Sequence, residues 1–182
     1  MAKIIYLLRH FRVKDHQKGK LTAQEFDAWV DDYDKMELEL LDLDLPSMDL
    51  CLVSPQHRAI TSANSLDIEY SIDERLREVE AKLFKESSWR FSKNSWLALG
   101  RLRWLFNIGS GETRKDSYSR AREVIEVLQE SKAQNILILS HGFFIKMLAK
   151  ELYEEGYRGR VDIKPKNGKV YPMRLENFCK YS

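Results

Sequence analysis

The sequence predicts an α/β fold with a mostly parallel central sheet, and two observations lead to this prediction. Apolar runs that are too short for buried helices recur along the 182 residues. Between them lie longer segments whose apolar residues recur at spacings of three and four, which is typical of amphipathic helices. Strands that alternate with helices usually build βαβ units. The length suits one domain with a sizeable core, so we expect a single domain over residues 1–182.

Composition and charge exclude several classes of function. The 30 Lys and Arg nearly balance the 28 Asp and Glu, and the net charge of +2 favours neither nucleic acid nor a membrane surface as a partner. No segment approaches the roughly 20 apolar residues of a membrane span, and the first residues lack the features of a signal peptide. Cys51 and Cys179 form neither a metal-binding spacing nor a disulfide framework. We therefore expect a cytosolic protein.

The first strand is expected at Ile4 to Leu8, directly before Arg9 and His10. Five apolar or aromatic residues in a row indicate an interior strand that is covered on both faces. Arg9 and His10 would then lie at the carboxyl end of the strand, where open α/β sheets bind their ligands. A surface turn is the alternative interpretation of this pair.

A helix is predicted after Thr22, which forms a capping-box pattern with Glu25. Its apolar positions follow the helical period (Phe26, Trp29, Val30 and Tyr33). Core packing of one face is the simpler role for these side chains, and a roof over a phosphate site is the alternative.

The second strand, Asp49 to Val53, runs into a helix predicted from Arg58 to Leu66. Arg58 therefore lies in the first turn of a helix that leaves the carboxyl end of a strand. Helix amino termini carry unsatisfied N–H groups and a partial positive charge, so an arginine there adds to a natural anion site. We interpret the neighbouring His57 as a solvated turn residue.

The middle of the chain carries two carboxylates and a tryptophan-rich segment. A third strand is expected at Ile68 to Ile72, and Glu78 and Glu80 follow it. Such carboxylates are usually solvated, but a proton donor beside a phosphate site would give one of them a role. In Ser87 to Phe106, tryptophans alternate with arginines (Trp89, Trp96 and Trp104; Arg90, Arg101 and Arg103). The spacing favours a helix with a core aromatic face and extended arginines over a pocket wall or a base-stacking surface.

A second histidine follows a buried strand in the last third of the chain. A helix capped by Asp116 or Ser117 is expected to end by Ser131, before a strand at Ile136 to Leu139. His141 then lies at a strand-to-helix turn, as Arg58 does, and the glycine after it permits close approach of the backbone to a ligand.

A basic loop, Arg158 to Lys169, precedes the last strand, near Val170 to Leu175. We interpret the loop as a solvated face, with contact to an acidic part of a substrate as the alternative.

Arg9, His10, Arg58 and His141 would converge if their strands were neighbours in the sheet. Five motifs occur in order around them: LLRH, SPQHRAITSA, LREVE, SGET followed by a helix with Arg120, and LSHGFFIKML. Together they resemble the motifs of the histidine phosphatase superfamily, the phosphoglycerate mutase-like group. The resemblance implies a three-layer α/β/α sandwich with a small cap, for which the available segments are Leu21 to Leu45 and Ser87 to Gly111.

The resemblance also implies a mechanism. His10 would be the nucleophile and form a phosphohistidine, Arg9 and Arg58 would bind the phosphate, and His141 would supply a further donor. Glu78 matches the acid that protonates the leaving oxygen, with Glu80 as the alternative. Neither a metal nor another cofactor is implied, because the arginines supply the charge that Mg²⁺ supplies elsewhere.

One departure from the family pattern is Phe11, where the family has glycine. We expect its side chain to enter the core or to cover the pocket mouth. The resemblance favours a compact phosphatase that acts on a small phosphate ester, with a phosphoprotein as another option. A phosphomutase, or a catalytically silent module that binds a phospho-ligand or a protein, is the alternative.

Overall fold

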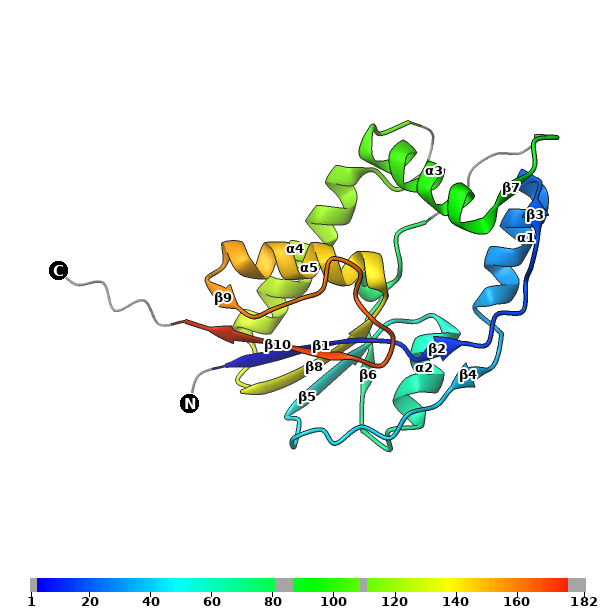
Figure 1. Cartoon of the computed structure of the whole chain (residues 1–182). Helices are drawn as coiled ribbons and strands as arrows, with labels where there is room; N and C mark the ends of the chain where they lie inside the picture. Colours follow the sequence, from blue (N-terminus) through cyan, green and yellow to red (C-terminus); the bar gives the residue numbers. More distant parts are fainter. Residues whose placement is uncertain (1–2, 81–86, 109–110, 177–182) are drawn as a thin grey trace.

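The computed structural model describes residues 3–80, 87–108 and 111–176, which surround a six-stranded sheet (Figure 1). The strand order is β6 (Ser71–Ile72), β5 (Leu50–Val53), β8 (Asn135–Ser140), β1 (Ile4–Arg9), β10 (Val170–Leu175) and β9 (Tyr157–Arg158). β6, β5, β8 and β1 are parallel neighbours, and β10 is antiparallel to β1 and β9. The prediction of a mostly parallel central sheet is confirmed.

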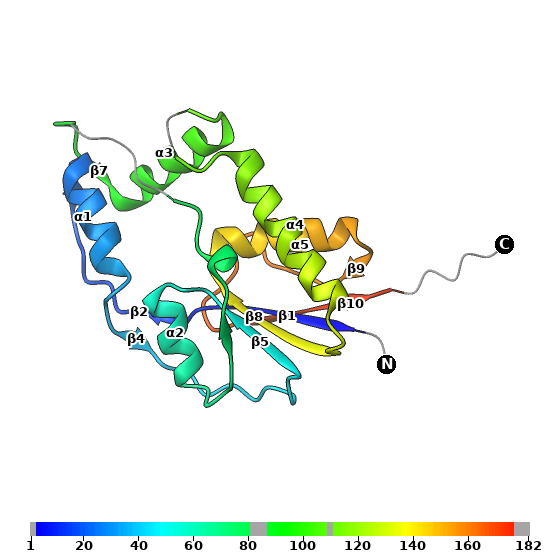
Figure 2. The ribbon, with the colours of Figure 1, turned by 180° about the vertical axis from the view of Figure 1, so that it is seen from behind.

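Helices cover the two faces of the sheet differently. α4 (Arg114–Glu130) and α5 (Gly142–Glu154) lie together over one face, and α2 (His57–Asn64) lies over the other (Figures 1 and 2). Successive strand residues point to opposite faces, so Leu7 belongs to the α4–α5 core and Leu8 to the α2 core. The three-layer prediction is therefore confirmed, although one outer layer contains a single helix.

The cap consists of α1 (Ala23–Tyr33) and α3 (Lys93–Leu105), which lie beyond one end of the sheet (Figure 1). The short strands β3 (Lys20–Leu21) and β7 (Phe91–Ser92) pair beside them, and Phe26 and Trp96 pack in a separate apolar cluster. Both predicted cap segments contribute, but the predicted end of the first segment, Leu45, was wrong. Leu43 and Leu45 pack beside α2 against the sheet, because this extended stretch covers apolar strand residues that α2 leaves open.

Three further predictions need correction. α4 begins at Arg114, because Thr113 is its cap and forms a capping box with Asp116. The third strand pairs with β5 only over Ser71–Ile72. Trp89 precedes α3 and is 69% exposed, whereas Trp96 is buried and donates its indole N–H to the Leu21 carbonyl at 2.8 Å. Only a tryptophan on the helix itself can share the face that packs on α1.

His57 was interpreted as a solvated turn residue. It is exposed, as expected, but it forms the first residue of α2. The single-domain assignment of residues 1–182 stays a prediction. Cys51 is a buried residue of β5, and Cys179 lies outside the described residues.

Phe11 occupies the core and not the pocket mouth. Its side chain is completely buried with Val13 and Leu38, which belong to the paired strands β2 (Arg12–Val13) and β4 (Leu38–Glu39). Its backbone N–H donates to the Ser62 hydroxyl at 2.9 Å, which ties the turn after β1 to α2. Of the two expected positions for this side chain, the structure selects the core.

We expect Phe11→Ala to lower the free energy of unfolding by about 3–5 kcal/mol, because it leaves a cavity among buried side chains. Urea denaturation measures the change. Phe106→Ala is the matched control: Phe106 is 66% exposed, and its loss should cost less than about 0.5 kcal/mol. Equal effects of the two substitutions would contradict the core position of Phe11.

Candidate active site

The ends of three parallel strands bring the predicted residues together. Arg9 pairs with Ser140 in the β1–β8 register, and Val53 pairs with Leu139 in the β5–β8 register, so the strands end level with one another. The chain continues from these ends into His10, into His141 and, through a short turn, into Arg58 on α2. All three side chains are buried, and the rings of His10 and His141 have centroids 5.1 Å apart.

His10 is held in one orientation by its own turn. Its Nδ1 lies 2.7 Å from the Phe11 carbonyl oxygen. A carbonyl only accepts hydrogen bonds, so Nδ1 carries the proton and Nε2 keeps its lone pair in the neutral ring. Burial lowers the pKa of His10 well below its ordinary value, and the charges of Arg58 and Arg9 lower it further. The ring is therefore a neutral potential nucleophile.

His141 lies deeper than His10 and is equally uncharged. Its Nε2 shares a 2.7 Å hydrogen bond with the Ser54 hydroxyl, at the turn after β5. Burial lowers the pKa of His141 well below its ordinary value, and Arg58, His10 and Arg9 add to the effect. Sequence reasoning missed this contact, which depends on the pairing of β5 with β8.

The two arginines are anchored through their terminal nitrogens. Arg9 donates from Nη1 to the Pro165 carbonyl at 2.7 Å, and Arg58 donates from Nη1 to Asp34 at 2.7 Å. Among the described residues, Nε of Arg9, Nε of Arg58 and Nδ1 of His141 are buried nitrogen atoms without a hydrogen-bond partner. Buried polar atoms normally have partners, so a group of such nitrogens beside two arginines indicates a site for an anion.

Asp34, the C-cap residue of α1, orients Arg58. In addition to binding the Arg58 guanidinium, the Asp34 carboxylate accepts hydrogen bonds from the backbone N–H groups of His57 at 3.1 Å and Arg58 at 3.3 Å. It therefore stabilises the amino terminus of α2 and joins the cap to the arginine. Sequence reasoning missed Asp34, because nothing distinguishes it from the neighbouring surface acids Asp31 and Asp32.

Glu78 lies at the amino terminus of α5. Its carboxylate accepts from the backbone N–H groups of Phe143 at 3.3 Å and Phe144 at 3.2 Å, and it lies 3.7 Å from the Arg101 guanidinium. The side chain of Gln56 links both sides of the site, because its Oε1 accepts from the Glu78 N–H at 2.9 Å and from Arg58 Nη2 at 3.2 Å. Glu80 is exposed, and it lines the same surface cavity as Glu78.

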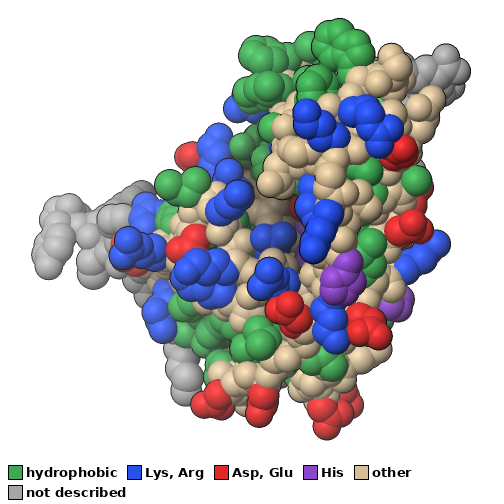
Figure 3. All heavy atoms as spheres, turned by 45° about the vertical axis from the view of Figure 1, so that its right-hand side comes forward, with side chains coloured by type: hydrophobic (Ala, Val, Ile, Leu, Met, Phe, Trp, Pro, Cys, Tyr) green, Lys and Arg blue, Asp and Glu red, His purple; other side chains and the backbone are tan. Residues whose placement is uncertain are grey.

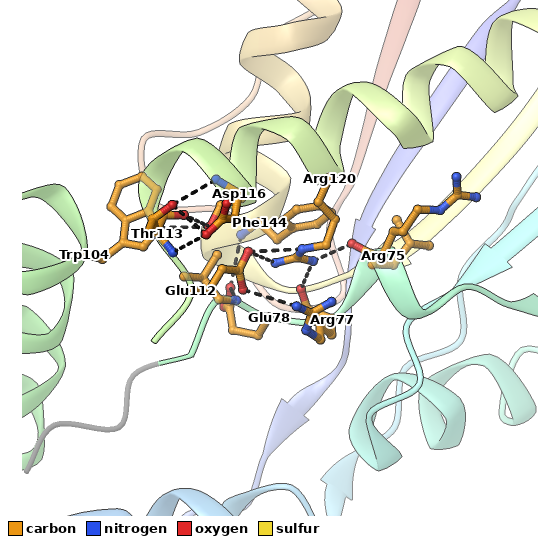
Figure 4. A network of polar contacts seen from close by, with 12 residues as sticks. Arg75, Arg77, Glu78, Trp104, Glu112, Thr113, Asp116, Arg120 and Phe144 are labelled. Carbon is orange, nitrogen blue, oxygen red and sulfur yellow. Dashed lines mark hydrogen bonds and ion pairs between the residues drawn. The ribbon is translucent and has the colours of Figure 1, made fainter. Parts of the chain in front are cut away.

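A buried ion pair supports the segment that carries Glu78 (Figure 4). Arg120 of α4 and Glu112 approach to 2.7 Å, and both side chains are only 7% exposed. Arg120 also donates to the backbone carbonyls of Arg75 and Arg77, and its guanidinium lies 4.2 Å from the Phe144 ring centroid. The SGET motif contains Glu112 and precedes the helix with Arg120, but the pairing of the two was not predicted; the structure places the pair behind Glu78.

A cavity of about 670 Å³ is lined at one end by Arg9, His10, Gln56, Arg58 and Glu78. α1 and α3 supply Trp29, Val30, Tyr33, Leu97 and Arg101, and the other side is formed by Val79, Glu80, Phe143, Lys146, Ile163, Lys164 and Pro165. In Figure 3, Lys and Arg side chains gather around the hollow on this face. The basic loop thus lines the cavity through Lys164, so its interpretation as a solvated face alone was incomplete.

In the described part of the chain, no group of three His, Cys, Asp or Glu side chains is arranged to hold a metal ion. None of the described helices has the length and apolar character needed to cross a membrane.

The model of the histidine phosphatase superfamily (branch 1) matches residues 5–179. The chain belongs to this superfamily. The family prediction, and with it a phosphatase enzyme, is confirmed. A curated relative from Hydrogenobacter thermophilus, "Putative phosphoserine phosphatase 2", is 25% identical over 96% of this chain and 90% of its own length.

Solved structures of the superfamily share the fold. A "putative alpha-ribazole-5′-P phosphatase" from Escherichia coli aligns with a TM-score of 0.60 and 21% identity, over 97% of this chain and 92% of the other. A phosphoserine phosphatase from Entamoeba histolytica, in complex with 3-phosphoglyceric acid, aligns with a TM-score of 0.52 and 16% identity, over 93% and 89%.

The two buried histidines predict a pH-dependent stability. In the folded state their pKa values lie well below the usual 6.5, so below pH 6.5 the unfolded chain binds more protons than the folded one. The free energy of unfolding should therefore fall as the pH is lowered through about 6.5, by about 1.4 kcal/mol per pH unit for each histidine. Urea denaturation between pH 5 and 7 measures the slope. His141→Asn should lower this slope by about 1.4 kcal/mol per pH unit, the contribution of one histidine. An unchanged slope would contradict the neutral state of His141.

Proposed function

We propose that the protein hydrolyses a phosphate monoester through a phosphohistidine at His10, without a metal ion. The observation that carries the proposal is the group of partnerless buried nitrogens on Arg9, Arg58 and His141, at a cavity that neutral His10 and the Glu78 carboxylate also line. A phosphate group supplies the acceptors that these nitrogens lack, and phosphoryl transfer needs positive charge around its three equatorial oxygens.

In the first step, Nε2 of His10 attacks phosphorus and the bond from phosphorus to the ester oxygen breaks. Protonated Glu78 gives its proton to the leaving oxygen, and the alcohol departs. In the second step, the Glu78 carboxylate takes a proton from water, the water oxygen bonds to phosphorus, and the N–P bond breaks. Inorganic phosphate leaves and neutral His10 is restored. Arg9, Arg58 and His141 stabilise the phosphoryl oxygens in both steps.

Small phosphate esters are the proposed substrates. The names of the relatives mention phosphoserine and α-ribazole 5′-phosphate, and the cavity of about 670 Å³ accommodates molecules of this size. The strand-end geometry supports catalysis over silent binding, because a module that only binds phosphate needs no neutral histidine beside a hydrogen-bonded carboxylate.

We expect His10→Ala to lower turnover of an aryl phosphate by at least about a thousandfold, because the nucleophile is lost. The assay contains EDTA, and an acid-labile phosphoprotein is trapped with ³²P-labelled substrate. Wild type should form the phosphoprotein and the variant should not. Wild-type turnover that stops in EDTA would overturn the metal-independent mechanism. Binding of inorganic phosphate without any turnover would favour the silent module.

Glu78→Gln should slow hydrolysis of alkyl phosphates by about 10²- to 10⁴-fold and of aryl phosphates much less, because only the basic alkoxide needs a proton as it leaves. Glu80→Gln makes the same chemical change two residues away and serves as the comparison. Rates with both classes of ester measure the effect. If Glu80→Gln shows the larger loss on alkyl phosphates, the acid is Glu80.

A further inference from the structure

The cavity continues from the phosphate end along an aromatic wall. Trp29 and Tyr33 lie one turn apart on α1, and both line the cavity with their ring centroids 5.1 Å apart and tilted by 51°. Leu97 of α3 lines it beside them, and Phe143 lines it from α5. We call the Trp29 and Tyr33 rings the α1 platform.

The α1 platform is held in place before any ligand binds. The indole N–H of Trp29 donates to Asp15 at 3.2 Å, and the Lys93 ammonium lies 5.6 Å from the indole centroid. Tyr33 lies under the Arg58 guanidinium, whose carbon is 5.7 Å from the ring centroid. A rigid apolar surface loses little conformational entropy when a ligand covers it.

The platform begins directly beside the phosphate end. Tyr33 contacts Arg58, and the next residue, Asp34, binds the same guanidinium. Trp29 lies about 6 Å farther along the helix axis, since four residues rise by that length. A flat group within a few bonds of the phosphate would therefore reach Tyr33 first and Trp29 next.

The positive charge of the cavity lies at its phosphate end. Apart from Arg9 and Arg58, the described lining contains three cations and three carboxylates: Arg101, Lys146 and Lys164, and Asp31, Glu78 and Glu80. Arg101 is already used, because it donates to the Val79 carbonyl at 3.1 Å and lies 3.9 Å from the Phe143 ring centroid. Because these cations and carboxylates are equal in number, the positive charge of the lining is concentrated at Arg9 and Arg58, at the phosphate end.

We propose that the substrate is the phosphate monoester of an alcohol that carries an uncharged aromatic or heteroaromatic ring, which binds on the α1 platform. This inference rests on the proposed function and narrows its substrate class. It separates ring-bearing esters from compact phospho-acids such as phosphoserine, whose remainder offers no apolar surface to Trp29 and Tyr33.

Phosphonates test the ring directly, because their C–P bond is not hydrolysed. We expect 2-phenylethylphosphonate to bind at least about tenfold more tightly than propylphosphonate in titration calorimetry, since the ring buries apolar area on the platform. 3-Phosphonopropanoate, which carries a second acid on a similar chain, should gain nothing over propylphosphonate. Equal affinities for the phenyl and propyl compounds, or tightest binding of the diacid, would overturn the proposal.

Two substitutions locate the ring. Trp29→Leu and Tyr33→Leu should each reduce the ratio of phenyl to propyl affinity several-fold, because each removes one ring of the platform. Trp89→Leu is the matched control, because Trp89 is 69% exposed and does not line the cavity, and the preference should persist. The platform is the wrong site if the preference survives in Trp29→Leu and Tyr33→Leu. Should either variant fail to fold, the wild-type affinities still decide the proposal.

Hydrolysis of 2-phenylethyl and propyl phosphate separates the two proposals, because both esters release alkoxides of similar basicity. A ring preference in binding without His10-dependent hydrolysis would overturn the phosphatase mechanism and keep the ring site. His10-dependent hydrolysis of both esters with equal kcat/KM, together with equal phosphonate affinities, would overturn the ring site and keep the mechanism.

Discussion

Two arginines and two histidines share one buried volume at the end of the sheet, and the need to avoid uncompensated charge there shapes the surrounding structure. Four buried cations would repel one another strongly in a medium of low polarity. The protein keeps both histidines neutral, and carboxylates or carbonyl groups compensate the arginines: Asp34 binds Arg58, and the Pro165 carbonyl binds Arg9. The remaining donors stay directed at an incoming anion.

The same constraint explains why parts distant in the chain are tied to one another at the site. Asp34 comes from the cap, Pro165 from the loop before the last strand, and Gln56 from the turn before α2. Behind Glu78, the buried pair of Arg120 and Glu112 fixes the segment from Arg75 to Arg77 through backbone carbonyls. A buried pair of this kind contributes less to net stability than to a single geometry, because the desolvation cost offsets much of its attraction.

The sequence was sufficient for the features that depend on local pattern. Apolar runs that end in Arg9 with His10 and in His141 marked the ends of buried strands, and the residue types at these ends identified the family. Features that depend on the packing of separate elements could not be predicted. Asp34 meets Arg58 only because the carboxyl end of α1 lies beside the first turn of α2. Trp89 differs from Trp96 in lying before the helix begins. The start of α4 was predicted wrongly because Asp116 is the N3 residue of a capping box, and Thr113 is its N-cap residue.

The unequal covering of the sheet has a consequence for how the molecule opens. On the α4–α5 face, two long helices with internal hydrogen bonds pack on the strands, whereas on the α2 face an extended stretch with Leu43, Leu45 and Met48 completes the cover beside one short helix. In the described structure this stretch forms neither helix nor strand, so the α2 side carries less hydrogen-bonded secondary structure, as regions that open at low free energy do. Arg58 lies on α2 in this half, while His10 and His141 follow strands in the middle of the sheet. Local opening on this side would therefore move Arg58 while the two histidines keep their positions.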